Sequence, residues 1–294
     1  MAGAKVPVVV DGRQVVLSNL DKVLYPETGF TKGQVLDYYT RVAPVLLPHL
    51  ADRPLTLKRY PDGVAGHSFY EKNAPSYRPD WLRVERLPSP GSTKQRETID
   101  YAVVDDLPSL VWVVNLACLE LHTPQWRVAA AHAGEGPDLL VLDLDPGPPA
   151  TVVECCAVAL LLRERLAADG VEVYAKTSGS KGMQLAARAP VPDTSTYAKR
   201  LAQELEAAHP SLVVHRMTKA LRPGKVLVDW SQNSSAKTTV SVFSLRARAR
   251  PTVSTPVTWD EVEACREPGD LVLPPDEALA RVERHGDLWA PLAG

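Results

Sequence analysis

Two aspartates separated by a single residue stand at the end of an apolar run, Val141-Leu-Asp-Leu-Asp-Pro146. On a β-strand, side chains alternate between two faces, so Asp143 and Asp145 project from the same face, about 6 to 7 Å apart. Two carboxylates this close repel each other unless a cation lies between them, and Mg²⁺ and Mn²⁺ prefer such oxygen ligands. The pattern favours a divalent-metal site over a strand end whose acids only face solvent.

A loop rich in small residues follows at Lys176-Thr-Ser-Gly-Ser-Lys-Gly182. Its glycines allow the backbone to approach an anion, its hydroxyl and N–H groups can donate hydrogen bonds, and Lys181 supplies a positive charge. The segment lacks the G-x-x-x-x-G-K-S/T pattern, and no helix follows it directly. Two interpretations stay open for it, a phosphate-binding loop and a plain hairpin turn.

A third aspartate lies in a basic part of the chain. Residues 216–250 contain eight Lys or Arg residues, and Asp229 is the only acid among them. An isolated aspartate after an apolar strand is typical of a turn, and a basic stripe is either a solvated face or a phosphate-binding surface. The lone acid among these cations favours the phosphate-binding interpretation. In contrast, residues 259–294 hold nine acids and three basic residues.

Histidine, aromatic and polar residues elsewhere have both functional and structural interpretations. His122 follows an apolar segment, a position that favours a hydrogen-bonded core histidine when it is considered alone. Phe69 and Tyr70 could form a stacking platform for unpaired bases, although adjacent aromatics are more often part of a core. Three polar residues flank the first predicted helix: Asn19, Lys22 and Lys32.

Hydrophobic periodicity predicts the elements that must position these residues. The N-terminal half is expected to contain a hairpin over 6–17, a helix that starts at a Thr31–Gln34 capping box and is kinked or divided at Pro44, loops and short strands over 53–82, and a buried helix over 107–121. The rest is expected to contain strands over 139–145, 171–175, 183–187, 225–230 and 238–243, helices over 151–168 and 194–208, and short elements near 260 and 275–284. The strand, helix, strand order of 139–175 indicates a βαβ-like unit and an α/β architecture.

Composition excludes several classes of protein. The chain has 294 residues, 33 Lys plus Arg, 35 Asp plus Glu and 45% hydrophobic residues, which is too apolar for a disordered protein and too balanced in charge for a generally basic nucleic-acid coat. It has neither an apolar run of about 18 residues nor a secretory signal. Four cysteines without zinc spacing are expected to be reduced, buried thiols of a cytosolic protein.

Together these motifs resemble the primase-polymerase domain of bacterial DNA ligase D, within the archaeo-eukaryotic primase superfamily. The resemblance runs nearly end to end, through 17–26, 119–127, 143–147, 177–182, 224–233 and 244–248. It implies an α/β (α+β) fold, with a primase-type catalytic core, a modified RRM-like sheet and a smaller flanking subdomain. We expect a single domain over 1–294, with an N-terminal part (1–130), a catalytic core (about 131–250) and an acidic C-terminal segment (251–294).

The resemblance implies a template-dependent nucleotidyltransferase that adds NTPs or dNTPs to a primer 3′-hydroxyl during non-homologous end joining or gap filling. Asp143, Asp145 and Asp229 would be the catalytic carboxylates and would hold two Mn²⁺ or Mg²⁺ ions. Residues expected around the nucleotide are His122, Ser178, Ser180, Lys181, Gln184, Arg222, Gln232 and Arg246. Residues expected at the DNA 5′-phosphate or template are Asn19, Lys22, Lys32, Phe69 and Tyr70.

The implied partners are template-primer DNA, or gapped and broken ends with a 5′-phosphate, together with a Ku-like end-binding protein and a separate ligase. The implied location is the bacterial cytoplasm, at the nucleoid. The chain has no K-x-D-G motif and no His-rich phosphoesterase region, so ligase and 3′-processing activities are not expected from it. The ordinary Met1 start and Gly294 end favour a free-standing protein over an excised domain.

Two positions depart from the family pattern. Gln184 stands where the family usually has histidine, and Phe243 stands where tyrosine is common. Glutamine can donate a hydrogen bond to phosphate but cannot carry a positive charge. We therefore expect retained activity with an altered nucleotide affinity.

Two other functions are compatible with parts of the sequence. A phosphohydrolase with a nucleophilic aspartate would share the Leu142-Asp-Leu-Asp segment, but such enzymes commonly continue with Gly-Thr or Gly-Val, and Pro146-Gly147 does not fit. A 5′-phosphate DNA-end binding module with a decayed catalytic site is the non-enzymatic alternative, and Gln184 is the residue that motivates it.

Overall fold

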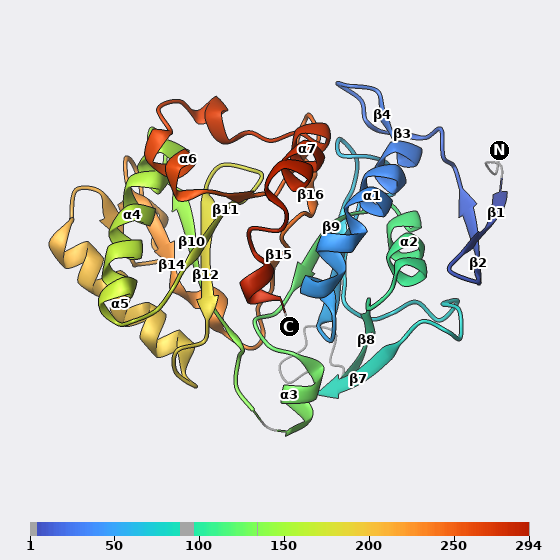
Figure 1. Ribbon diagram of the computed structural model, residues 1–294, viewed down its shortest axis with the longest axis horizontal. Coiled ribbons are helices and arrows are strands. Elements are labelled where there is room, and N and C mark those ends of the chain that lie inside the picture. Colours follow the sequence, from blue (N-terminus) through green and yellow to red (C-terminus); the bar gives the residue numbers. More distant parts are fainter. Residues whose placement is uncertain (1–4, 89–96, 134, 294) are drawn as a thin grey trace.

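The computed structural model describes residues 5–88, 97–133 and 135–293, so Met1 and Gly294 lie outside the described residues. Two large β-sheets form the framework of the molecule. In Figure 1, the sheet that contains β10, β12 and β14 lies on the left with α4 and α5, and the sheet that contains β8 and β9 lies on the right with α1 and α2. We call the first the site-bearing sheet and the second the N-terminal sheet.

The site-bearing sheet has the strand order β13-β14-β10-β12-β11-β18. Its elements are β10 (Leu139–Pro146), α4 (Val152–Ala168), β11 (Tyr174–Thr177), β12 (Met183–Arg188), α5 (Thr194–Ala208), β13 (Val213–Val214), β14 (Val226–Asp229) and β18 (Pro256–Val257). β12 lies between β10 and β11 and is antiparallel to both, so β10-α4-β11 is a split βαβ unit. The β-α-β-β-α-β order of these elements is that of an RRM-like sheet, which confirms the predicted fold class.

Alternation along β10 separates the two faces of this sheet. Leu140, Leu142 and Leu144 pack into the cluster formed with α4 and α5, while Val141 belongs to the cluster of α1, α2 and the N-terminal sheet. The site-bearing sheet therefore has helices on one face and the N-terminal sheet against the other. Val141 thus packs into the core of the N-terminal half, and the single domain over 1–294 with boundaries near 130 and 250 stays a prediction.

The N-terminal sheet has the order β15-β9-β5-β8-β7, with β6 paired to β5. Its strands are β5 (Pro54–Arg59), β6 (Phe69–Glu71), β7 (Val84–Pro88), β8 (Thr98–Val103), β9 (Cys118–Thr123) and β15 (Thr239–Val240), and it packs with α1 (Lys32–Leu50) and α2 (Leu107–Asn115). The predicted capping box at Thr31 and Gln34 begins α1, and a second one at Thr151 and Glu154 begins α4.

The remaining elements surround these two sheets. They are the hairpin of β1 (Lys5–Val10) and β2 (Arg13–Ser18), then β3 (Val23–Tyr25), β4 (Phe30–Thr31), α3 (Val128–Ala133), β16 (Leu245–Arg246), β17 (Thr252–Val253), α6 (Trp259–Ala264) and α7 (Pro275–His285). The four cysteines are buried free thiols, as predicted. Among the described residues, no helix is long and apolar enough to cross a membrane.

The predicted helix over 107–121 is wrong in its second half. α2 ends at Asn115, Ala117 adopts a positive φ of 58°, and β9 begins at Cys118. All six side chains of β9 are buried, but Leu119-Glu120-Leu121-His122 alternates apolar and polar residues, a strand signal that the helix prediction did not use. The helix over 32–50 is not divided at Pro44, because Val42 and Leu46 on either side of it are both buried in the core.

Two predicted strands differ in their bounds. The strand expected over 171–175 is found at 174–177, because its pairing with β12 runs from Tyr174 to Thr177. The strand expected over 238–243 is reduced to Thr239–Val240. Phe243 has a φ of 60°, which ends the extended backbone before the predicted strand is complete.

Candidate active site

Three aspartates meet on the face of the site-bearing sheet that is turned away from its helices. Asp143 and Asp145 lie on β10, and Asp229 ends β14 directly opposite Asp143 in the antiparallel register. One carboxylate oxygen of each residue lies within 4.8 Å of the others. The structure therefore brings together the two aspartates that share a strand face and the third one, 84 residues further along the chain.

The electrostatics of this triad fit a divalent cation. Burial, together with the charge of Asp145, raises the pKa of Asp143 to about 7. Burial and the charge of Asp229 also raise the pKa of Asp145. A bound cation would remove this mutual repulsion, and three carboxylates leave coordination positions for water or phosphate oxygens. The donor set suits Mg²⁺ or Mn²⁺.

Neighbouring side chains orient two of the carboxylates. Gln184 Nε2 donates to Asp143 Oδ1 at 3.0 Å, and Gln232 Nε2 donates to Asp229 Oδ2 at 2.8 Å. The backbone N–H of Ser231 donates to Asp229 Oδ1 at 3.0 Å. The amides of Gln184 and Gln232, both predicted near the nucleotide, are thus committed to carboxylates of the triad.

The loop between β11 and β12 closes around a hydroxyl group. Ser178 Oγ accepts hydrogen bonds from the N–H groups of Ser180 and Gly182, at 3.2 and 3.3 Å. A Cβ atom on Gly182 would lie 2.0 Å from the carbonyl oxygen of Leu144, so only glycine lets the loop pack this closely against β10. Lys181 is exposed on the same loop.

Cations from separate segments surround Asp145. The charges of Arg222, Arg246 and Lys181 all lower the pKa of its carboxyl group, although burial outweighs them. Arg246 Nη1 donates to the carbonyl oxygen of Ser178 at 2.8 Å, which joins this arginine to the β11–β12 loop. The structure thus brings these three basic residues near the triad, an arrangement that suits a polyphosphate.

His122 lies on β9 of the N-terminal sheet and contacts an acid that the sequence analysis missed. Its Nε2 lies 3.0 Å from Glu120 Oε2, and Arg246 Nε lies 3.3 Å from Glu120 Oε1. Burial alone would raise the pKa of Glu120, but the bond to His122 and the charge of Arg246 lower it to about 2. Residues 120 and 122 share a face only in a strand, so the helix prediction concealed the pair.

A second polar group forms where the end of β2 meets the start of α1. Lys32 Nζ is buried and donates to the carbonyl oxygen of Ser18 at 2.6 Å and to Asn115 Oδ1 at 2.8 Å. Burial and the nearby charge of Lys22 lower the pKa of Lys32 to about 8. Asn19 is exposed in the same turn with a φ of 54°. The three residues predicted for a 5′-phosphate therefore lie close together.

The adjacent aromatics of β6 have different neighbours. Tyr70 is 56% exposed, and its ring meets that of His122 edge-on with 5.5 Å between the ring centroids. The guanidinium group of Arg59 lies 5.3 Å from the ring centroid of Phe69. Tyr70 thus contacts His122, one of the residues expected near the nucleotide. The stacking of either ring on a base stays a prediction.

An RRM-like sheet that carries a carboxylate triad ringed by cations defines the class: an α/β protein of the metal-dependent phosphoryl-transfer type. Residues 31–289 match the family described as "LigD, primase-polymerase domain". The chain belongs to this family.

The chain is also similar to named proteins and to a solved structure of this family. The multifunctional non-homologous end joining protein LigD of Mycolicibacterium smegmatis is 44% identical over 283 residues, covering 95% of this chain and 36% of that protein. The corresponding DNA repair protein of Mycobacterium tuberculosis H37Rv is 45% identical over 286 residues, covering 94% and 36%. This chain thus spans about a third of the length of these relatives. The solved polymerase domain from Mycobacterium tuberculosis ligase D, in complex with DNA, has a TM-score of 0.86 and 44% identity, and covers 95% of this chain and 98% of that one.

Proposed function

We propose that the chain is a template-dependent nucleotidyltransferase that adds NTPs or dNTPs to a primer 3′-hydroxyl in non-homologous end joining or gap-filling repair. The observation that carries the proposal is the triad of Asp143, Asp145 and Asp229 on an RRM-like sheet, in a chain of this family. We propose that it acts at DNA ends in the bacterial cytoplasm, at the nucleoid, alongside a Ku-like end-binding protein and a separate ligase.

The three aspartates would hold two Mn²⁺ or Mg²⁺ ions. When bound, these ions supply activation of the 3′-hydroxyl and neutralisation of the triphosphate and leaving pyrophosphate. The protein contributes preorganisation, because Gln184 and Gln232 fix the orientation of Asp143 and Asp229 before any ligand arrives.

Cations and N–H groups beside the triad would bind the incoming nucleotide. Lys181, Arg222 and Arg246 offset the negative charge of the triphosphate near Asp145. Ser178 and Ser180 present a compact loop to the phosphates. The other proposed nucleotide contacts are His122, Gln184 and Gln232. His122 and Arg246 both contact Glu120, so they lie near each other. The two glutamines donate hydrogen bonds to carboxylates of the triad.

DNA is the proposed macromolecular ligand. The similar polymerase domain of Mycobacterium tuberculosis ligase D was solved in complex with DNA. In this chain Lys32, Lys22 and Asn19 would grip a downstream 5′-phosphate, and Phe69 and Tyr70 would contact the template. The basic stripe of 216–250 faces phosphate while the acidic segment of 259–294 limits the total attraction, so we expect modest DNA affinity that falls with salt.

Primer extension on gapped DNA tests the proposal. The substrates differ by the presence of a 5′-phosphate, and each is assayed with NTPs or dNTPs and with Mg²⁺ or Mn²⁺. We expect extension that disappears in Asp143→Ala and persists in Asp276→Ala, a matched variant at an exposed helix position. Full extension by Asp143→Ala would overturn the metal assignment.

The same preparation distinguishes the two alternatives. Tight DNA binding without nucleotide addition would identify a DNA-end binding module, and phosphate release from a small phosphomonoester would identify a phosphohydrolase. DNA binding that is unchanged between low and high salt would contradict the proposed role of the basic stripe.

A further inference from the structure

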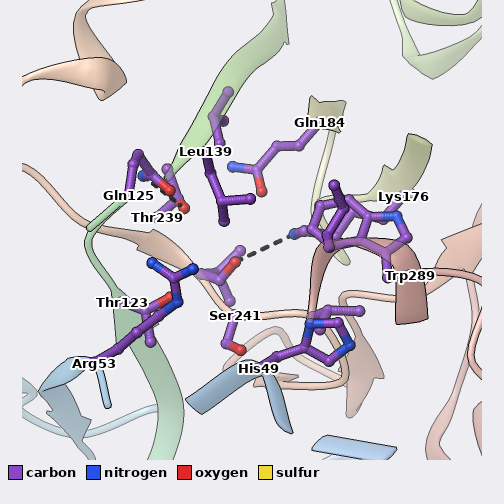
Figure 2. A pocket seen from close by; sticks show the side chains of 14 residues that line it. His49, Arg53, Thr123, Gln125, Leu139, Lys176, Gln184, Thr239, Ser241 and Trp289 are labelled. Atoms are coloured by element: carbon purple, nitrogen blue, oxygen red, sulfur yellow. Dashed lines mark hydrogen bonds between the residues drawn. The ribbon is translucent and has the colours of Figure 1, made fainter. Parts of the chain in front are cut away.

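A small cavity lies between the two sheets, next to the triad. Its volume is about 30 Å³, enough for at least one water molecule. Lys176 of β11 and Gln184 of β12 line it and are direct neighbours in the antiparallel register. Figure 2 shows both side chains directed into the space between the sheets.

Lys176 carries a buried amino group with neutral hydrogen-bond partners. The residue is 2% exposed, and its Nζ donates to the carbonyl oxygen of Val240 at 3.2 Å and to Ser254 Oγ at 2.5 Å. The Ser254 hydroxyl in turn donates to the carbonyl oxygen of Thr177 at 2.9 Å. These two contacts leave the amine nitrogen one more hydrogen-bonding position.

Gln184 has a complementary buried group. Its Nε2 donates to Asp143 Oδ1, while its Oε1 is buried without a hydrogen-bond partner among the described residues. When Asp143 is ionised, as cation binding requires, rotation of the amide by 180° would place Oε1 against the Asp143 carboxylate, where two acceptors repel each other. The observed orientation therefore requires a donor for Oε1 on the cavity side, because a buried carbonyl oxygen rarely lacks a donor.

We propose that Lys176 is a positioning residue for Asp143, acting through an ordered water in this cavity that bridges Lys176 Nζ and Gln184 Oε1. The water donates one hydrogen to Oε1. Its second contact is with Nζ, which donates to the water oxygen as an ammonium or accepts the other hydrogen as an amine. The bridge therefore forms in either protonation state of Lys176.

The bridge has a consequence for the triad. It holds the Gln184 amide so that its N–H points at Asp143 Oδ1, which leaves Oδ2 of that aspartate available to a cation. A histidine at this position would present a ring nitrogen in place of the amide oxygen, so this bridge to Oε1 is specific to the glutamine. The catalytic role of the contacts from Lys176 through the water and Gln184 to Asp143 rests on the proposed function. The presence of these contacts does not depend on it.

A crystal structure at about 1.5 Å resolution tests the water directly. We expect a density peak about 2.7 to 3.2 Å from both Lys176 Nζ and Gln184 Oε1. In Lys176→Met, the peak should be lost or displaced. A cavity without a bridging peak in the unmodified protein would overturn the proposal.

A double-mutant cycle tests the positioning role by Mn²⁺ binding alone, measured by calorimetry without nucleotide or DNA. We expect Lys176→Met to weaken Mn²⁺ binding about fivefold when Gln184 is present and less than about twofold in a Gln184→Leu background. Equal effects in both backgrounds would contradict the coupling. Urea unfolding of each variant confirms that it is folded, and Lys199→Met, an exposed lysine on α5, is the matched control.

The two proposals fail in different ways. An unmodified protein that binds no Mn²⁺ would contradict the proposed function. A protein that binds Mn²⁺ with no coupling between Lys176 and Gln184 would contradict only the positioning role.

Discussion

Gln184 donates its side-chain N–H to Asp143 Oδ1 at 3.0 Å, across the register that pairs β12 with β10. Gln184 occupies the position where the family usually has histidine, and its side chain is almost fully buried. This contact links the main departure from the expected family pattern to a carboxylate of the proposed metal site. The effect of the glutamine is therefore expected at the triad as well as at the nucleotide.

Replacement of the glutamine separates these two effects. We expect Gln184→His to lower the apparent Km for the nucleotide about two- to fivefold, because a protonated imidazole adds a positive charge that glutamine lacks. The measurement is single-nucleotide insertion at saturating Mn²⁺, with Gln14→His on exposed β2 as a control. An unchanged Km would count against a triphosphate contact.

The raised pKa of Asp143 predicts how stability depends on pH without metal. In the native state this carboxyl group binds a proton up to about pH 7, whereas in the unfolded chain it loses the proton near pH 4. The native state thus binds more protons than the unfolded chain in this interval. The contribution of Asp143 to the free energy of unfolding therefore falls as pH rises from about 4 to about 7.

Asp143→Asn should therefore stabilise the metal-free protein. We expect the free energy of unfolding at pH 8 to rise by about 1 to 3 kcal/mol relative to the parent. The difference in free energy of unfolding between the variant and the parent should become smaller towards pH 4.5. Urea unfolding of both proteins at pH 8 and at pH 4.5 measures this difference. An equal difference at both pH values would argue that the destabilisation does not come from the ionisation of Asp143. The same increase in free energy of unfolding in Asp276→Asn would argue that it is not specific to the triad.

Metal binding should show the opposite dependence on pH. Because a cation and a proton compete for Asp143, Mn²⁺ affinity is expected to fall about fivefold between pH 7 and pH 6 and to change little above pH 8. Calorimetric titration with Mn²⁺ measures this dependence. Affinity that is constant from pH 6 to 8 would be inconsistent with binding at this carboxylate.

The polar group of β2 and α1 predicts discrimination between DNA ends. We expect Lys32→Met to weaken binding to gapped DNA with a 5′-phosphate about tenfold and to leave binding to the 5′-hydroxyl substrate unchanged. Fluorescence anisotropy at fixed salt is the measurement. Since Lys32 also bonds Ser18 and Asn115, Lys22→Gln at an exposed position is the second variant, and equal losses on both substrates would contradict the assignment.

A buried asparagine supports the strand that carries two of the aspartates. Asn233 Oδ1 accepts from the N–H of Val141 at 2.9 Å, and its Nδ2 donates to the carbonyl oxygen of the same residue at 2.7 Å. Asn233→Ala would leave both backbone groups of β10 without these partners, so we expect a loss of about 2 to 4 kcal/mol in the free energy of unfolding. Ser234→Ala, at the exposed neighbouring position, should change it by less than about 0.5 kcal/mol.

Local rules acting over a few residues were enough to predict much of this protein from its sequence. The shared face of Asp143 and Asp145 follows from strand alternation, and the starts of α1 and α4 follow from capping boxes. Ordered motifs along the chain identified the family, which the matching residues 31–289 confirm.

Only the tertiary structure decided the contacts that depend on strand register and on complete burial. β9 is buried on both faces, so the burial of Glu120 and His122 and their contact with each other are seen only in the folded protein. The placement of Gln184 against Asp143, and of Lys176 beside Gln184, depends on which strands lie side by side. Strand order is set by the packing of the whole core, and no local pattern of residue types encodes it.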